Sequence, residues 1–172
     1  GSHSSISFNK ITESSLQKLD TSNLYLHQTP IKSDIYIKNR FLNHPVYNYN
    51  VYAIIKNGQT HALCVIRQIL HEGVSVLRIV DFIGANEAFS LLSDFFLAIL
   101  EEYKAEYIDL YSHGIQLEIL KQAGFINRKK VEGLIIPNYF EPFEQNNIDI
   151  TYAYKTDLSL PPVRLFKADG DQ

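Results

Sequence analysis

The stretch "YSHG" ends an apolar run with two side chains that could move protons, Tyr111 and His113. An ordinary imidazole titrates near ~6.5 and could accept a proton from an amine, and a phenol could donate one. We therefore predict Tyr111 and His113 as candidate catalytic residues. By strand alternation Asp109 shares a face with Tyr111, where it could orient one of these groups or point to solvent. The alternative stays open that Tyr111 is a strand-end aromatic and His113 a loop residue.

A second stretch, "RIVDFIGANEAFSLL", runs from an apolar strand through a turn with one glycine into an apolar helix. The unpaired N–H groups at the start of a helix can hold a phosphate. The candidate cofactor-binding residues are those of the turn: Ile83, Gly84, Ala85 and Asn86. The turn could equally serve only to change the direction of the chain.

The charges around this turn work against an anion. Asp81 and Glu87 flank it, and no Lys or Arg lies between Arg78 and Lys104. The side chain of Asn86 could also cap the helix and so compete with a ligand for the same N–H groups. The residues alone therefore leave phosphate binding at this turn undecided.

A polar segment nearer the N-terminus, "KNRFLNHPVYNYNVY", could hold a polar acceptor molecule. Arg40 could bind a carboxylate or a phosphate through two parallel N–H donors. The candidate substrate-binding residues are Arg40, His44, Tyr47 and Asp81. The alternative is a tyrosine-rich loop that seals the edge of a sheet. Arg67 and Arg78 fall inside predicted strands, where each needs solvent or an anionic partner such as Asp81.

The elements that must position these residues begin with three β-rich runs at 51–57, 60–70 and 74–83. Asn57-Gly58 joins the first two runs and is typical of a tight hairpin, so the runs predict an antiparallel meander. Two short helices are predicted before them, over 13–19 with Thr12 as cap and over 34–42 with Ser33 or Asp34 as cap.

Beyond the meander, apolar residues at helical spacing predict a long helix over 88–103. The predicted elements that follow are a strand at 107–111, a helix at 114–123 that stops at Gly124, and strands at 125–130 and 148–156. A strand, a crossover helix and a second strand imply that 77–83 and 107–111 run parallel. The predicted fold class is therefore α/β (α+β), with a mixed, mostly antiparallel central sheet, one parallel strand pair and flanking helices.

Bulk properties exclude several classes of protein. A chain of 172 residues can bury one core, and no apolar run approaches the ~20 residues of a membrane span. The net charge of −3 gives no reason to expect nucleic acid as a partner. The single cysteine, Cys64, cannot form an internal disulfide, and the histidines lack metal-ligand spacing. We expect no membrane partner, no metal and a reducing, cytoplasmic setting.

The ends of the sequence predict a simple domain organisation. Residues 1–3, Gly-Ser-His, are typical of a tag remnant. The chain has no methionine, which favours a piece excised from a longer protein, with a missing flanking domain. We expect one domain over residues 4–157 and a poorly structured tail over 158–172, which contains Pro161-Pro162 and "KADGDQ". A homodimer is also an open expectation.

The order of these elements over roughly residues 6–156, with the signature "LEILKQAGFINR", resembles the GNAT acyltransferase superfamily. In that family a helix of this kind ends in Gly-Phe, as at Gly124-Phe125. The resemblance implies an acyl-CoA N-acyltransferase-like fold with a splayed strand pair. It also implies acetyl-CoA or a related acyl-CoA as cofactor, its pantetheine arm between the two parallel strands and its diphosphate on the turn.

The sequence departs from the family pattern at two places. The family turn has Arg or Gln, two residues, Gly, one residue, then Gly or Ala; here Gly84 matches, and Asp81 and Asn86 do not. Many members carry a catalytic Tyr four residues before the Gly of Gly-Phe, and that position is Leu120. Retention of CoA binding is thus in question, and Tyr111 and His113 are the substitutes for the missing acid.

The resemblance implies transfer of an acyl group, such as acetyl, from a CoA thioester to an amine. "IIPNYFEPFEQNNIDITYAY" is loosely similar to GNAT-like proteins of bacterial surface-polysaccharide biosynthesis, which implies a small-molecule amine acceptor, an amino sugar that can be nucleotide-linked. The alternative function is a non-catalytic GNAT-fold domain that binds a ligand or a partner within a larger enzyme.

Overall fold

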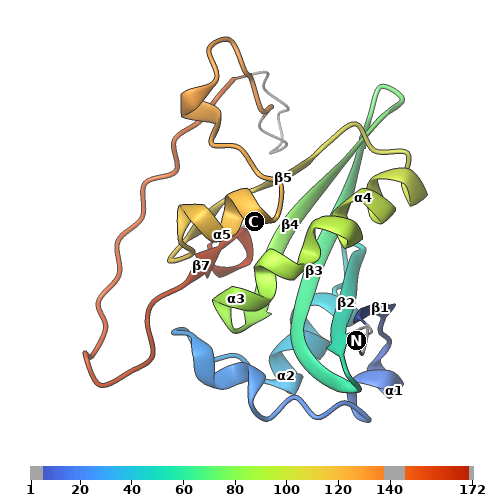
Figure 1. The fold of residues 1–172 in the computed structure, drawn as a ribbon, viewed down its shortest axis with the longest axis vertical. Helices are drawn as coiled ribbons and strands as arrows, with labels where there is room; N and C mark the ends of the chain where they lie inside the picture. Colours follow the sequence, from blue (N-terminus) through green and yellow to red (C-terminus); the bar gives the residue numbers. More distant parts are fainter. Residues whose placement is uncertain (1–5, 138–145, 171–172) are drawn as a thin grey trace, which may run out of the picture.

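A five-stranded sheet forms the centre of the computed structural model, which describes residues 6–137 and 146–170 (Figure 1). Its strands, in spatial order, are β1 (Ile6–Lys10), β2 (Tyr49–Lys56), β3 (Gln59–His71), β4 (Val74–Gly84) and β5 (Ile108–Leu110). The first four strands are antiparallel neighbours, and β5 runs parallel to β4. The predicted meander and mixed sheet are confirmed, whereas β1 was not predicted.

Helices cover both faces of this sheet. They are α1 (Glu13–Leu16), α2 (Asp34–Ile37), α3 (Asn86–Phe89), α4 (Ser93–Glu102) and α5 (Leu117–Gln122). One core cluster joins alternate strand residues such as Cys64 and Phe82 to α3 and α4, and a second joins the residues between them to α1 and α2. None of the helices in the described ranges is long and apolar enough to span a membrane.

The predicted starts of the first two helices agree with the structure, the helix predicted over 114–123 begins later, at Leu117, and the predicted long helix is interrupted. Thr12 caps α1 and Ser33 caps α2, whose chain continues as a π-helical turn, η2 (Lys38–Leu42). Between α3 and α4 a 3₁₀ turn, η3 (Ser90–Leu92), interrupts the helix. The Ser90 hydroxyl donates to the carbonyl of Glu87 at 2.7 Å, a local bond that competes with regular helical geometry.

Two strands expected in the C-terminal third are wrong. Arg128–Lys130 form a 3₁₀ turn, η4, because the Asn127 side chain caps the amide of Lys129. Residues 148–156 belong to no strand and lie in an exposed arm that returns to the body at β7 (Leu165–Phe166) (Figure 1). In the described part of the chain no strand pairs with this arm through its backbone, so its alternating pattern joins no ladder.

The parallel pair parts after three residues. β5 pairs with Leu77–Ile79 alone, although β4 continues to Gly84. The cause lies in β4, where Val65 of β3 pairs with Asp81 and Ile66 pairs with Ile79, so that Val80 is an extra, bulged residue. The predicted parallel pair is confirmed, and beyond the bulge a gap opens between β4 and the chain that follows β5.

The expected poorly structured tail is wrong for residues 163–169. This segment, called the C-terminal segment below, contains β7 (Leu165–Phe166) and a 3₁₀ turn, η5 (Lys167–Asp169). β7 pairs antiparallel with β6 (Ser112–His113). The segment is ordered because it alternates, with Arg164, Phe166 and Ala168 all buried in the domain.

Replacing Phe166 with Ala should lower the free energy of unfolding by about 3–5 kcal/mol, because the change empties a buried aromatic site. Urea unfolding followed by circular dichroism measures this. Leu158→Ala is the control, since Leu158 is 99% exposed and its loss should change stability by less than about 0.5 kcal/mol. Equal stability of the two variants would show that the C-terminal segment is not part of the folded core.

Candidate functional site at the open edge of β4

The gap beside β4 is filled by a buried arginine of the C-terminal segment. The Arg164 guanidinium donates from Nη2 to the carbonyl of Phe82 at 3.1 Å and from Nη1 to Oδ1 of Asn86 at 2.6 Å. It also donates to Oε1 of Gln28. Arg164 is 2% exposed. Its side chain thus supplies hydrogen bonds to β4 where β5 no longer does.

A second buried contact of the segment centres on Lys32. Nζ of Lys32 lies 3.3 Å from Oδ2 of Asp81 and also forms an ion pair with Asp169. The hydroxyl of Tyr36 accepts from Nζ at 3.3 Å, and the other carboxylate oxygen of Asp81 accepts from the Phe82 amide at 2.9 Å. All three charged side chains are almost fully buried. Asp81, predicted to contact substrate, is buried and linked through Lys32 to Asp169 of the segment.

Burial shifts the pKa values of this cluster. Burial raises the pKa of Asp81 to about 6; nearby Lys32 opposes the shift, and Asp169 adds to it. Burial lowers the pKa of Arg164 to about 10, with the carboxylates of Asp81, Asp169 and Glu87 opposing. Burial also lowers the pKa of Lys32, but the two carboxylates outweigh it and the net shift is upward. At neutral pH, therefore, two buried cations face the carboxyl groups of Asp81 and Asp169.

The turn before α3 has no side-chain cap. Ala85 is the N-cap residue of α3, and no side chain bonds to the first helical amides. The expected capping by Asn86 is wrong, because its amide nitrogen donates to the Gly114 carbonyl at 3.2 Å while its oxygen accepts from Arg164. The first amides of α3 therefore carry no side-chain cap.

Gly84 has a structural reason to be glycine. Its φ is +137°, and a Cβ placed there would lie 2.6 Å from the carbonyl oxygen of His61 on β3. Close packing of the turn on β3 accounts for the glycine by itself. Gly84 is thus no independent sign of a ligand.

Tyr111 lies over a buried ion pair. Arg78 donates to both carboxylate oxygens of Asp109 at 2.7 Å, and its guanidinium lies 5.1 Å from the centre of the Tyr111 ring. Burial raises the pKa of Tyr111, with Arg78 opposing. Arg78 has the anionic partner that its place in a strand requires, but the partner is Asp109 and not Asp81, and Asp109 does not point to solvent. Asp109 neutralises Arg78 instead.

His113 lies between two half-exposed tyrosines. The Tyr152 hydroxyl is 2.5 Å from Nδ1, and the Tyr154 hydroxyl is 3.4 Å from Nε2. The backbone of His113 pairs with Leu165 of the C-terminal segment. Because Gly114 follows directly and accepts from Asn86, the predicted catalytic histidine and the predicted cofactor turn lie at the same end of the gap.

The predicted acceptor residues separate into two groups. Arg40 donates to the carbonyl of Ala168 at 3.2 Å and therefore belongs to the site. His44 accepts from the Tyr47 amide and stacks on its ring, and the Arg67 guanidinium lies 3.7 Å from the centre of that ring. His44 and Tyr47 thus hold their own loop.

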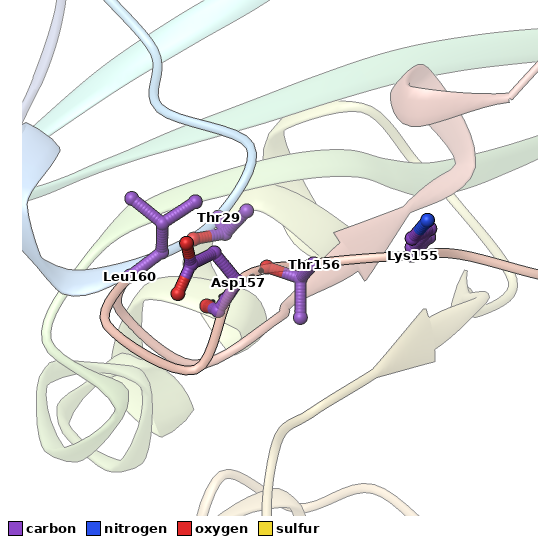
Figure 2. Close-up of a pocket in the computed structure, with 5 residues that line it drawn as sticks. All are labelled: Thr29, Lys155, Thr156, Asp157 and Leu160. Carbon is purple, nitrogen blue, oxygen red and sulfur yellow. Dashed lines mark hydrogen bonds between the residues drawn. The ribbon is translucent and has the colours of Figure 1, made fainter.

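A surface pocket of about 490 Å³ lies where the exposed arm meets the N-terminal loop (Figure 2). Its lining residues are Thr29, Lys155, Thr156, Asp157 and Leu160. Thr29 fastens the arm here, since its hydroxyl donates to the carbonyl of Pro161 at 2.7 Å. None of the residues predicted from sequence lines this pocket, so it marks the entry of the C-terminal segment rather than the predicted site.

Sequence reasoning missed four residues of the site, Gln28, Lys32, Arg164 and Asp169. The period-two alternation of "VRLFKAD" was a usable signal that one side of residues 163–169 is buried. The partners were not readable, because Gln28 and Arg164 are separated by 136 residues and Asn86 and Arg164 by 78. These pairs form because the C-terminal segment packs against the domain, and no local sequence motif predicts them.

Comparison with known proteins supports the fold. No protein-family model matches the sequence, and no curated protein sequence matches it. An acetyltransferase of Trypanosoma brucei is similar in structure, with a TM-score of 0.51, 15% identity, and 77% of this chain and 100% of that chain covered. The fold is GNAT-like.

Two further structures are similar at lower scores. An aminoglycoside acetyltransferase from an uncultured soil metagenomic sample has a TM-score of 0.49, 12% identity and coverage of 78% of this chain and 95% of its own. A GNAT family acetyltransferase of Staphylococcus aureus has a TM-score of 0.47, 19% identity and coverage of 72% and 93%. At such identities the likeness concerns the course of the chain alone.

Replacing Asp81 with Asn should remove a pH dependence of stability. The folded pKa near 6 lies above the ~3.9 of an exposed aspartate, so the folded state holds an extra proton between about pH 4 and 6. The stability from this group is therefore present at low pH and falls as pH rises through that window. Relative to D81N, the unchanged chain should lose stability from pH 4 to pH 7 in urea unfolding. Asp94→Asn, at an exposed site, is the control. The prediction would be contradicted if the difference in stability from the unchanged chain varied with pH in the same way for D81N and D94N.

Proposed function

We propose that this chain is an N-acyltransferase domain that transfers an acyl group, such as acetyl, from a CoA thioester to an amine of a small molecule. The carrying observation is the pair β4–β5 in a GNAT-like fold, which parts after Ile79 beside the uncapped turn at Gly84–Asn86. Helix-start amides without a side-chain cap and an interrupted strand pair are features that could receive a thioester arm.

The residues at the turn suit the phosphates of such a cofactor. The residues in the gap do not suit its pantetheine arm. The amides before α3 carry no side-chain cap and suit a phosphate. Arg164, which contacts Asn86, is a cation beside the turn, but it belongs to the segment that fills the gap. In this conformation the gap therefore has no room for a pantetheine arm, and thioester binding requires a rearrangement.

The acceptor in this proposal is an amino sugar, which can be nucleotide-linked, in bacterial surface-polysaccharide biosynthesis. His113 is the candidate base, since it lies at the turn end of the gap and is flanked by Tyr152 and Tyr154. The half-exposed rings offer apolar faces with polar edges, which suit a polar ring. Tyr111, whose pKa is raised by burial, keeps its proton at neutral pH and could donate it.

A second candidate function is a non-catalytic GNAT-fold domain that binds a ligand or partner of a larger enzyme. One observation favours it: the gap that would take the thioester holds Arg164 and Phe166. The absence of a Tyr at the position of Leu120 agrees with it. Activity measurements separate the two functions.

The chain should release CoA when incubated with millimolar acetyl-CoA and a panel of amino sugars, measured as free thiol. His113→Gln should lower kcat by about 10²-fold, the usual contribution of one general base. His71→Gln, in the β3–β4 hairpin, changes the same side chain away from the turn and should leave the rate unchanged. Folded protein that releases no CoA with any amine would leave the non-catalytic function standing.

Replacing Glu87 with Gln should tighten binding of acetyl-CoA about three- to tenfold, because one like charge near the phosphates is removed. Isothermal titration calorimetry measures the Kd. Glu101→Gln makes the same charge change near the far end of α4 and should have no effect. An affinity for E87Q that is unchanged or weaker would place the phosphates elsewhere on the chain.

A further inference from the structure

We propose that the C-terminal segment, residues 163–169, is an intramolecular competitor for the thioester site, so that segment and thioester exclude one another from the gap beside β4. The inference rests on the proposed function and adds a regulatory device to the same site. Four features of the described residues carry it: the hydrogen-bonding edge of β4, the cations around the gap, two unpaired buried donors, and the exposed connection to the segment.

The segment uses the hydrogen-bonding edge that the gap would offer to a ligand. Before the bulge, odd-numbered residues of β4 face β5; the Leu77 amide donates to Tyr107, and the Ser75 carbonyl accepts from Glu106. The extra residue Val80 reverses this alternation, so the carbonyl of Phe82 faces the side that β5 has left. Arg164 occupies that carbonyl. A ligand that binds along this edge must displace it.

The segment also occupies the cations around the gap. Asp169 pairs with Lys32, and the carbonyl of Ala168 accepts from Arg40. Arg40 was predicted to bind an anionic or polar acceptor molecule. In this structure the carbonyl of Ala168 occupies its guanidinium instead. The segment therefore blocks the proposed acceptor side as well as the thioester side.

The fit of the segment in the gap is incomplete. Among buried side-chain atoms of the described residues, two have no hydrogen-bond partner, Nε of Arg164 and Nε2 of Gln28. Both belong to the side chains that meet where the segment enters the gap. Unpaired buried donors destabilise the conformation in which the segment fills the gap. The segment is therefore easier to displace by a ligand.

The connection to the segment allows it to withdraw. Residues 149–160 are all exposed, and Leu158 is 99% exposed. The connection is fastened to the body at Thr29, which bonds to Pro161 and Pro162, and at His113, whose ring contacts the hydroxyls of Tyr152 and Tyr154. The segment can therefore leave the gap through movement of a solvated arm, with the central sheet unchanged.

The test uses the full chain with a protease recognition sequence inserted after Leu158. The protein is folded first and then cut, so that the C-terminal fragment stays in place as a non-covalent ligand. Acetyl-CoA is added, and native mass spectrometry counts the protein with fragment, with acetyl-CoA, or with both. We expect each molecule to carry one or the other, and the Kd for acetyl-CoA to be at least tenfold weaker in the uncut chain, because binding is reduced by the fraction of open molecules.

Two results would overturn the inference and can be told apart. A complex that holds both fragment and acetyl-CoA, with equal Kd in cut and uncut chains, would overturn the competition and leave the proposed acyltransferase standing. Acetyl-CoA that binds neither the uncut chain nor cut protein from which the fragment has dissociated would overturn both. These outcomes do not depend on the folding of a truncated protein.

A variant of the uncut chain gives an independent measurement. Arg164→Gln removes the bond to Phe82 and should tighten acetyl-CoA binding at least about tenfold by raising the open fraction. Lys155→Gln removes a cation from the exposed arm and should leave the Kd unchanged. Weaker binding in R164Q would overturn the inference, since it would show that Arg164 helps to hold the thioester.

Discussion

The structure depends on one constraint: backbone groups of β4 that lose their strand partner inside the protein must find other hydrogen-bond partners. The bulge at Val80 ends the pairing with β5, and β4 remains buried to Gly84. The Arg164 guanidinium meets this need at Phe82, and the Asp81 carboxylate accepts from the amide of the same residue. Both of these side-chain groups are charged, so their burial sets a second requirement.

That requirement is the balance of buried charge. A buried ion is tolerated only with a partner, and removal of one partner costs about 3–5 kcal/mol. Here Lys32 and Arg164 stand against Asp81 and Asp169, with Tyr36 completing the contacts of Lys32. Two of these four charges belong to the C-terminal segment. The charges in the gap are therefore balanced only when the C-terminal segment is folded into it. The stability of the protein consequently depends on whether the segment occupies the gap.

Sequence reasoning succeeds in this protein where a local pattern determines the outcome. Asn57 and Gly58 both have positive φ, as the tight hairpin requires, and the crossover rule correctly predicts the parallel pair. Sequence reasoning fails where a strand partner distant in sequence determines the structure. Residues 148–156 alternate as a strand does and yet join none, whereas Leu165–Phe166 pair with β6 in a stretch expected to be poorly structured. Alternation predicts which residues face inward, but the neighbouring strand is chosen by tertiary packing.

The same distinction explains the acidic turn. Judged by its neighbours in sequence, the turn at Gly84–Asn86 has only like charges for an anion, and the structure brings Arg164 to it from the tail. The positive charge and the filled gap therefore occur together, because both come from the C-terminal segment. If the segment withdraws, the turn keeps its uncapped amides and loses its cation, while Glu87 remains. The closed state is thus favoured electrostatically without a ligand, and any phosphate that opens the gap must bind through backbone amides and the cations left behind, Lys32 and Arg40.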